Sequence, residues 1–161
     1  MEIIWAPWRM EYLKNLSEKN NECIFCKMPL QKSDKTNLII YRGKENFIIL
    51  NKYPYTNGHL MVVPYLHTSD SVDLNDATAL EMWKLTHKCK EVLENTFHPH
   101  GFNIGINIGH AAGAGIDQHI HMHIVPRWNG DINFMSSVGK AKVISQDLSE
   151  TYDSLFPGFS K

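Results

Sequence analysis

Three histidines alternate with apolar residues in the segment His119-Ile120-His121-Met122-His123. Because side chains alternate across a β-strand, this spacing predicts that the three imidazoles share one face while the residues between them face the core. His119 and His123 would then lie about 13 Å apart, since a strand rises roughly 3.3 Å per residue. One metal ion therefore cannot bind all three histidines, although two neighbours could share an ion.

The alternating histidines could carry out phosphoryl chemistry. A neutral imidazole is a good nucleophile toward phosphorus and a good leaving group from it, which suits covalent nucleotidyl transfer. The attacking nitrogen must be unprotonated, so the other ring nitrogen should donate to a fixed acceptor such as a backbone carbonyl. His121 is the natural nucleophile, and His123, about 7 Å further along the face, can donate to the phosphate or the leaving oxygen. The alternative is a metal-dependent hydrolase in which a His-x-His pair binds the catalytic ion.

Cys23 and Cys26 form a Cys-x-x-Cys pair, whereas Cys89 lies alone in a predicted helix. In a reducing compartment such a pair is more often a metal site or a redox motif than a structural disulfide. Two cysteines supply half of a tetrahedral zinc site, and the remaining ligands can come from distant parts of the sequence. A reduced pair without metal is the alternative, and Cys89 is expected to be a small buried residue.

The elements that position these residues follow from the hydrophobic pattern. A long helix is predicted from Asn75 or Asp76 to Phe97, with Asp73 or Asn75 as its cap. Its buried stripe recurs every three or four residues and consists of Met82, Leu85, Cys89 and Val92. A short helix is predicted near residues 148–155. Strands are predicted at residues 38–41, 47–50, 59–64 and 102–108 and at the histidine segment.

These strands, in meander order with one long crossover helix, predict an α+β fold with an antiparallel five-stranded sheet. At 161 residues the chain is most simply one domain. We divide it into an N-terminal arm with the cysteine pair (residues 1–35), a core (36–135) and a C-terminal extension (136–161).

The His-φ-His-φ-His-φ-φ pattern, in which φ is apolar, resembles that of the histidine triad (HIT) superfamily of nucleotide hydrolases and transferases. Other residues occur in the order that this family shows: Asn51, Gly58-His59, Val62-Val63-Pro64 and the glycine-rich run before the histidines. The resemblance covers residues 20 to 135 and implies the same α+β fold. Two further segments are similar to the branch of diadenosine tetraphosphate phosphorylases and dinucleoside polyphosphate hydrolases: Trp5-Ala6-Pro7-Trp8-Arg9 and Pro126-Arg127-Trp128 through Phe134.

The resemblance implies roles for individual residues. His121 would attack the α-phosphorus to form a nucleotidyl-histidine, with His123 and His59 as supporting catalytic residues. The loop of residues 111–115 would bind phosphate through its backbone N–H groups. The predicted substrate contacts are Asn51 for the ribose, Asn107 for the α-phosphate, Ile49 for the base pocket, and Gly113 and Gly115 for phosphate.

A zinc-bearing subset of the superfamily is similar at four positions. Carried over to this chain, the ligands are Cys23, Cys26, His67 and His119, which would form a closed structural Cys₂His₂ site. His119 would then bind zinc while His121 and His123 act on phosphate. Magnesium could accompany the polyphosphate substrate.

The leading hypothesis is an enzyme that cleaves a dinucleoside polyphosphate at the α-phosphate. The similarity of the terminal segments favours phosphate over water as the acceptor, although no residue selects between them by its chemistry. The alternatives are hydrolysis of the same substrates, hydrolysis of nucleoside phosphoramidates, and a nucleotide-binding interaction protein without turnover. The intact middle histidine disfavours this last alternative.

The whole-chain properties limit the partners. A net charge of −1 provides no general attraction to nucleic acid or to an anionic membrane. The N-terminus does not resemble a signal peptide, and no apolar run is long enough to span a bilayer, so a cytoplasmic location is expected. The resemblance implies a nucleotide substrate and a homodimer that pairs through the long helix and an edge strand.

Overall fold

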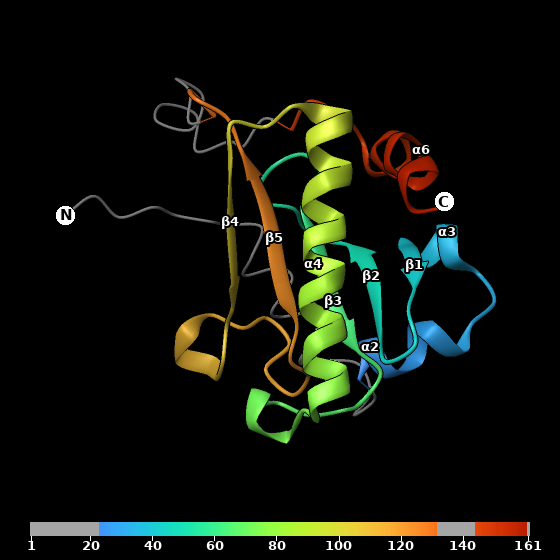
Figure 1. Cartoon of the computed structure of the whole chain (residues 1–161), viewed down its shortest axis with the longest axis vertical. Helices are drawn as coiled ribbons and strands as arrows, with labels where there is room; N and C mark the ends of the chain where they lie inside the picture. The colour runs from blue at the N-terminus through green and yellow to red at the C-terminus, as the bar shows by residue number, and fades with distance from the viewer. Residues whose placement is uncertain (1–22, 132–143, 161) are drawn as a thin grey trace.

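The computed structural model describes residues 23–131 and 144–160, which form a five-stranded antiparallel sheet with helices (Figure 1). The strands are β1 (Ile39–Arg42), β2 (Asn46–Leu50), β3 (Leu60–Pro64), β4 (Gly101–Ile106) and β5 (Met122–Arg127). This architecture confirms the predicted α+β fold class. The predicted similarities at residues 5–9 and 132–134 lie outside the described residues, and the division into arm, core and extension stays a prediction.

The strand order, β1-β2-β3-β5-β4, differs from a simple meander because β5 lies between β3 and β4. Ile124 of β5 is opposite Leu60 of β3 on one side and opposite Ile104 of β4 on the other. β5 is largely buried, whereas most of β4 is half-buried or exposed. The long crossover carries β4 to the edge, so that the more apolar strand occupies the interior position.

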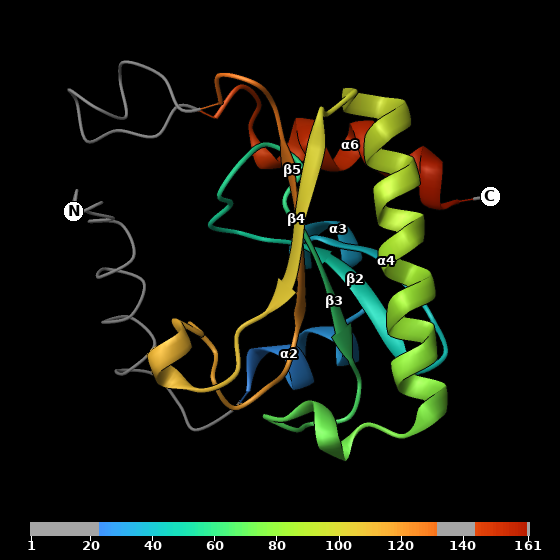
Figure 2. The same ribbon diagram turned by 60° about the vertical axis from the view of Figure 1, so that its left-hand side comes forward.

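The crossover is α4 (Asp76–Phe97), whose bounds agree with the prediction. The side chain of Asn75 caps it by accepting the backbone N–H of Thr78 at 2.9 Å, and His98 ends it in the left-handed conformation. The predicted apolar stripe of α4 is buried against the sheet. Figure 2 shows α4 lying along one face of the sheet.

The C-terminal helix α6 (Leu148–Phe159) packs on the same face and is four residues longer than predicted. Phe159 is buried in the core, which accounts for the additional turn. Gly158 permits this approach, because a Cβ atom there would lie 2.7 Å from a methyl group of Val92. Tertiary packing therefore extends the helix through Pro157.

The second face of the sheet carries its own apolar cluster, made of Phe25, Ile39, Phe47, Ile49, Met61 and Val63. Phe25 comes from α2 (Ile24–Lys27), a short helix that the sequence pattern did not predict. The other short elements are η1 (Met28–Leu30), α3 (Asp34–Asn37), η2 (Ser71–Asp73) and η3 (His110–Ala112). Within the described ranges, no helix combines the length and apolar character that a membrane span requires.

Glu81 of α4 stabilises the turn between β1 and β2 through hydrogen bonds to its carboxylate. Its carboxylate accepts the backbone N–H groups of Lys44, Glu45 and Asn46 and the side-chain amide of Asn46, at 2.7–2.9 Å. Burial alone would raise the pKa of Glu81, but these hydrogen bonds lower it, and the net pKa lies below its ordinary value. The ionised carboxylate is therefore favoured by folding.

We expect Glu81→Gln to destabilise the protein by roughly 1–2 kcal/mol at pH 7, because the neutral amide accepts these N–H groups less strongly. Since folding lowers the pKa of Glu81, its contribution is full above the unfolded value and is lost as the pH falls through the lower folded value. Thermal denaturation over a pH series measures this. The two proteins should converge below about pH 4, and a difference independent of pH would contradict the assignment.

Candidate active site and metal-ligand cluster

The histidine segment runs along the second face of the sheet, but only part of it is strand. β5 begins at Met122, so His119 and His121 lie just before it. The backbone N–H of Ile120 donates to the carbonyl of Thr68 at 2.6 Å instead of joining the ladder. The rings of His121 and His123 nevertheless remain neighbours, with centroids 4.7 Å apart. His119 has a different set of partners.

His121 has the geometry of a neutral nucleophile. Its Nδ1 lies 2.8 Å from the backbone carbonyl oxygen of His119. A carbonyl only accepts hydrogen bonds, so Nδ1 carries the proton and Nε2 keeps its lone pair. Burial lowers the pKa of His121 despite the opposing effect of this hydrogen bond. The imidazole is therefore unprotonated near neutral pH, as attack on phosphorus requires.

Phe25 packs against two of the three histidines. Its ring centroid lies 5.2 Å from that of His121 and 5.5 Å from that of His119, and the side chain is 2 % exposed. Sequence reasoning missed this contact, although the position of Phe25 between the two cysteines could have indicated it. The short helix α2, which carries Cys26 and begins just after Cys23, therefore also buries one side of the candidate nucleophile.

His59 and His123 form a second histidine pair beside His121. Nε2 of His59 lies 3.0 Å from Nδ1 of His123, and the side chain of His59 is completely buried. On the other edge of the His59 ring, Nδ1 receives the backbone N–H of Tyr55 at 3.1 Å. The Tyr55 ring stacks on His59 with centroids 4.9 Å apart. Sequence reasoning identified His59 but not Tyr55.

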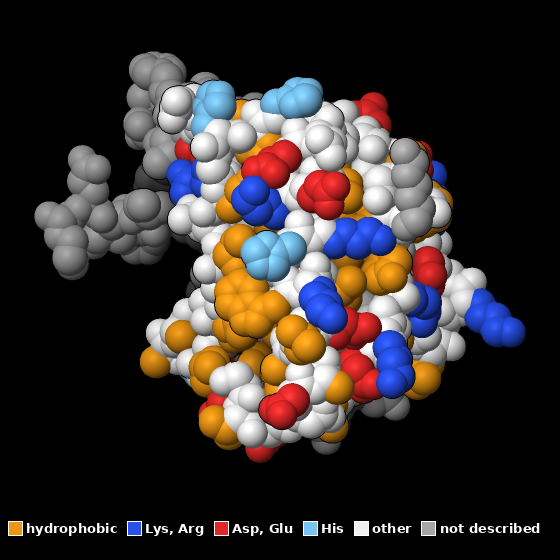
Figure 3. Space-filling model, viewed as in Figure 1, with side chains coloured by type: hydrophobic (Ala, Val, Ile, Leu, Met, Phe, Trp, Pro, Cys, Tyr) orange, Lys and Arg blue, Asp and Glu red, His pale blue; other side chains and the backbone are white. Residues whose placement is uncertain are grey.

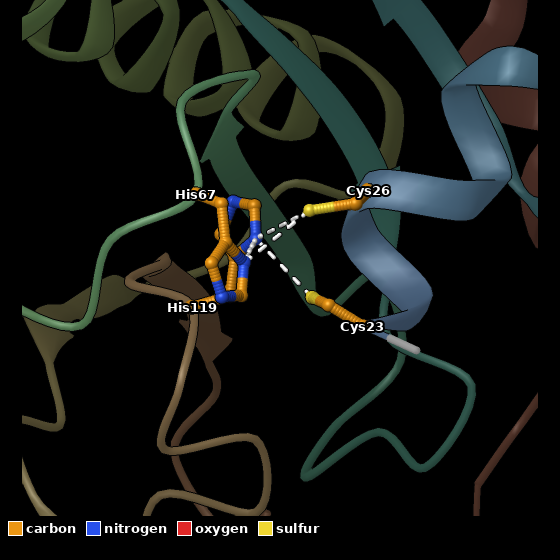
Figure 4. Close-up of side chains that lie close together, drawn as sticks. All are labelled: Cys23, Cys26, His67 and His119. Atoms are coloured by element: carbon orange, nitrogen blue, oxygen red, sulfur yellow. Dashed lines mark hydrogen bonds between the residues drawn. The ribbon is translucent and has the colours of Figure 1, made fainter. Parts of the chain in front are cut away.

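Four side chains of residue types that can bind a metal ion converge from three separate parts of the chain (Figure 4). They come from α2 and its N-cap residue, from the loop after β3 and from the segment before β5, and they are Cys23, Cys26, His67 and His119. Their ligand atoms all lie within 4.8 Å of one another. Nδ1 of His119 is 3.3 Å from Cys23 Sγ and 3.3 Å from His67 Nδ1, and Cys26 Sγ is 3.3 Å from His67 Nδ1.

The protonation pattern of this cluster fits a bound divalent cation. Nε2 of His119 donates to the carbonyl of Pro64 at 2.8 Å, which leaves the Nδ1 lone pair facing the thiols. Without a cation, burial opposes ionisation of Cys26 and, together with the smaller effects of the charge and the hydrogen bond of Cys23, raises its pKa to about 11. A cation would remove this penalty. Two sulfur and two imidazole ligands are a set that zinc prefers in closed tetrahedral sites.

The structure gives the positions of the remaining predicted site residues, but it does not test their contact with a substrate. Ile49 lies in the same apolar cluster as Phe25, on the face that carries the histidines. The side chain of Asn51 faces His59, with its Nδ2 atom 3.3 Å from Nδ1 of that ring. Asn107, Gly113 and Gly115 lie in the connection between β4 and β5, where Gly113 adopts φ +84°. Their contact with phosphate stays a prediction.

Comparison with known proteins agrees with this geometry. The family model for the HIT domain matches residues 32–130. A protein from Mycobacterium tuberculosis named AP-4-A phosphorylase is 42% identical over 158 residues, which cover 94% of this chain and 80% of that protein. A bis(5'-nucleosyl)-tetraphosphatase (asymmetrical) from Schizosaccharomyces pombe is 30% identical over 95 residues, covering 59% of this chain and 52% of that protein.

A similar fold occurs in the crystal structure of a Zn-bound histidine triad family protein from Mycobacterium smegmatis. Its TM-score is 0.70 at 30% identity, and the match covers 86% of this chain and 94% of that one. Together with the family model, which spans most of the chain including the sheet and the three histidines, this settles the classification. The chain belongs to the HIT domain family.

Proposed function

We propose that this chain cleaves dinucleoside polyphosphates of the diadenosine tetraphosphate type at the α-phosphate, through a covalent intermediate on His121, with inorganic phosphate as acceptor. The observation that carries the chemistry is the hydrogen bond from His121 Nδ1 to the carbonyl of His119, which directs the unprotonated Nε2 away from the backbone. The AP-4-A phosphorylase at 42% identity supports the substrate class and the acceptor.

In the first step, the Nε2 lone pair of His121 attacks the α-phosphorus. An N–P bond forms while the P–O bond to the nucleoside polyphosphate breaks, and the leaving oxygen takes the electron pair. His123 is placed beside His121 to donate a hydrogen bond from its own Nε2 to that oxygen. Ile49, the residue predicted to line the base pocket, belongs to the apolar cluster on this face.

In the second step, an oxygen of inorganic phosphate attacks the α-phosphorus and the N–P bond breaks. The product from an adenylyl intermediate is ADP, and the imidazole recovers its lone pair. If water attacks instead, the product is AMP. The tetraphosphatase relative, which is 30% identical over 95 residues, favours this hydrolytic reaction as the second candidate.

Product analysis distinguishes the two reactions. We expect diadenosine tetraphosphate to yield ADP and ATP only when inorganic phosphate is present. AMP and ATP formed without phosphate would establish the hydrolase instead. If the intact dinucleotide survives under both conditions while adenosine 5′-phosphoramidate is consumed, the substrate assignment is wrong and the phosphoramidate alternative replaces it.

We also infer that Cys23, Cys26, His67 and His119 hold a zinc ion with a structural role. The convergence of their four ligand atoms supports this, as does the 30% identical Zn-bound relative. With four protein ligands such a site has no open position, so zinc would attach α2 to the histidine segment and take no part in the chemical steps.

We further propose that the chain forms a homodimer through α4 and β4. Among the described residues, β4 has one neighbouring strand, β5, and so it is an edge of the sheet. Leu80 and Trp83 of α4 and Ile104 of β4 are between 40 and 56 % exposed. Figure 3 shows hydrophobic side chains gathered on this face of the molecule. A second copy would cover this surface, and light scattering should therefore give twice the mass of the chain.

A further inference from the structure

The loop before β3 fixes the orientation of the Asn51 side chain. The backbone N–H of Tyr53 donates to Asn51 Oδ1 at 2.9 Å, which identifies this atom as the amide oxygen. The amide nitrogen then faces His59 Nδ1 at 3.3 Å. The backbone N–H of Tyr55 donates to the same Nδ1 at 3.1 Å. Two N–H donors on one ring nitrogen require that nitrogen to be unprotonated, so the proton of His59 lies on Nε2.

This arrangement also determines which ring nitrogen of His123 carries the proton. Nε2 of His59 is the donor in its 3.0 Å contact with His123 Nδ1, so the proton of His123 lies on Nε2. An additional proton on the pair would have to lie on His59 Nδ1, facing two N–H donors, or on His123 Nδ1, facing the N–H of His59. His59 is completely buried and Tyr55 stacks on its ring. The pair therefore holds one proton for each ring.

A neutral pair favours one class of leaving group. His123 can stabilise negative charge on the leaving oxygen by a hydrogen bond. It cannot transfer that proton outright, because an imidazolate would remain. The end of a polyphosphate chain departs as a stable anion and needs only the hydrogen bond, whereas an amine or an alcohol needs a proton.

We propose that Asn51 is a positioning residue that sets the leaving-group class of the reaction, by keeping the His59–His123 pair neutral. The inference rests on the proposed function, since it takes His121 as the nucleophile. In Asn51→Asp, a charged acceptor replaces one of the two N–H donors at His59 Nδ1, and His59 gains a proton there that displaces the hydrogen bond from the backbone N–H of Tyr55. As the P–O bond breaks, His59 passes its Nε2 proton to His123 Nδ1, and His123 passes its own Nε2 proton to the leaving oxygen. His59 returns to the neutral form.

Two aryl esters of AMP test this proposal. The 4-nitrophenyl ester releases an acidic phenol that departs as an anion, whereas the phenyl ester benefits far more from a proton. Because the nucleoside is the same, any effect of Asn51 on ribose binding cancels in the ratio of the two kcat/KM values. We expect wild-type protein to prefer the nitrophenyl ester strongly, and Asn51→Asp to reduce this preference about tenfold.

Asn57→Asp is the matched control, because it adds the same charge to the same loop. Asn57 Nδ2 donates to Gln146 Oε1 at 3.1 Å, and Asn57 Oδ1 accepts from Thr151 Oγ1 at 2.9 Å. We therefore expect Asn57→Asp to leave the ratio of the two kcat/KM values at the wild-type value. An equal change in both variants would show that charge alone acts, and would overturn the proposal.

Ring-nitrogen NMR at pH 7 provides a second test that does not depend on activity. We expect wild-type His59 to be neutral with its proton on Nε2, and His59 of Asn51→Asp to be cationic. A wild-type His59 protonated on Nδ1 would overturn the proposal, even if the variant failed to fold. So would a cationic His59 in Asn51→Asp with an unchanged rate ratio. By contrast, full ester cleavage by His121→Ala would refute the proposed function, while the NMR result would still report the proton positions.

Discussion

Turnover of diadenosine tetraphosphate is expected to fall by about 10⁴-fold or more in His121→Asn. This variant keeps an amide N–H near the position of Nδ1, so the hydrogen bond to the His119 carbonyl can persist. It lacks a nucleophilic nitrogen, and the covalent route is closed. Steady-state kinetics measures the loss, and an alkaline quench followed by mass spectrometry should detect adenylylated wild-type protein and none of the variant.

His123→Gln is the appropriate comparison, because its longer side chain can hold an amide N–H donor near the position of His123 Nε2 while leaving His121 in place. We expect it to lose only about 10²-fold and still to form the adenylylated protein. If His121→Asn kept turnover close to that of wild-type protein, the covalent mechanism would be wrong. A similar loss in both variants, with neither adenylylated, would indicate direct transfer.

The second large effect is expected from the metal-ligand cluster. Cys26→Ala should abolish stoichiometric zinc binding and lower the Tm by about 10 °C or more, because a structural zinc site stabilises the folded state by several kcal/mol. Removal of the ion would leave α2 without its attachment to the loop after β3 and to His119. Phe25, which lies between the two cysteines, would then lose its defined position against His121.

Metal analysis of the purified protein, with melting curves before and after chelation, measures both quantities. Cys89→Ala is the matched control, because Cys89 is a buried cysteine of α4 in the core on the opposite face and should not change the zinc content. A wild-type protein that contains no zinc and melts identically with and without added zinc would refute the site. Immediate loss of activity on chelation, before any unfolding, would instead support a metal-dependent hydrolase.

The amino-acid sequence determined the features that depend on local pattern. The bounds of α4 follow from the capping side chain of Asn75 and from the apolar stripe, both of which act within a few turns of one helix. The hairpin of β1 and β2 follows from two apolar runs and a short polar turn. The four predicted metal ligands also converge as expected, because the family pattern already encodes their distant positions.

Tertiary structure alone decided the features that depend on residues far apart in the chain. The placement of β5 between β3 and β4 sets His123 against His59, which is 64 positions away. Phe25 contacts His119 and His121 only because α2 folds onto their face of the sheet. The proton positions of His59 and His123 depend on hydrogen-bond partners from a loop, and these partners cannot be inferred from spacing. The sequence therefore identified the groups that we propose to carry the chemistry, while packing and hydrogen bonding determined the protonation state and orientation of each group.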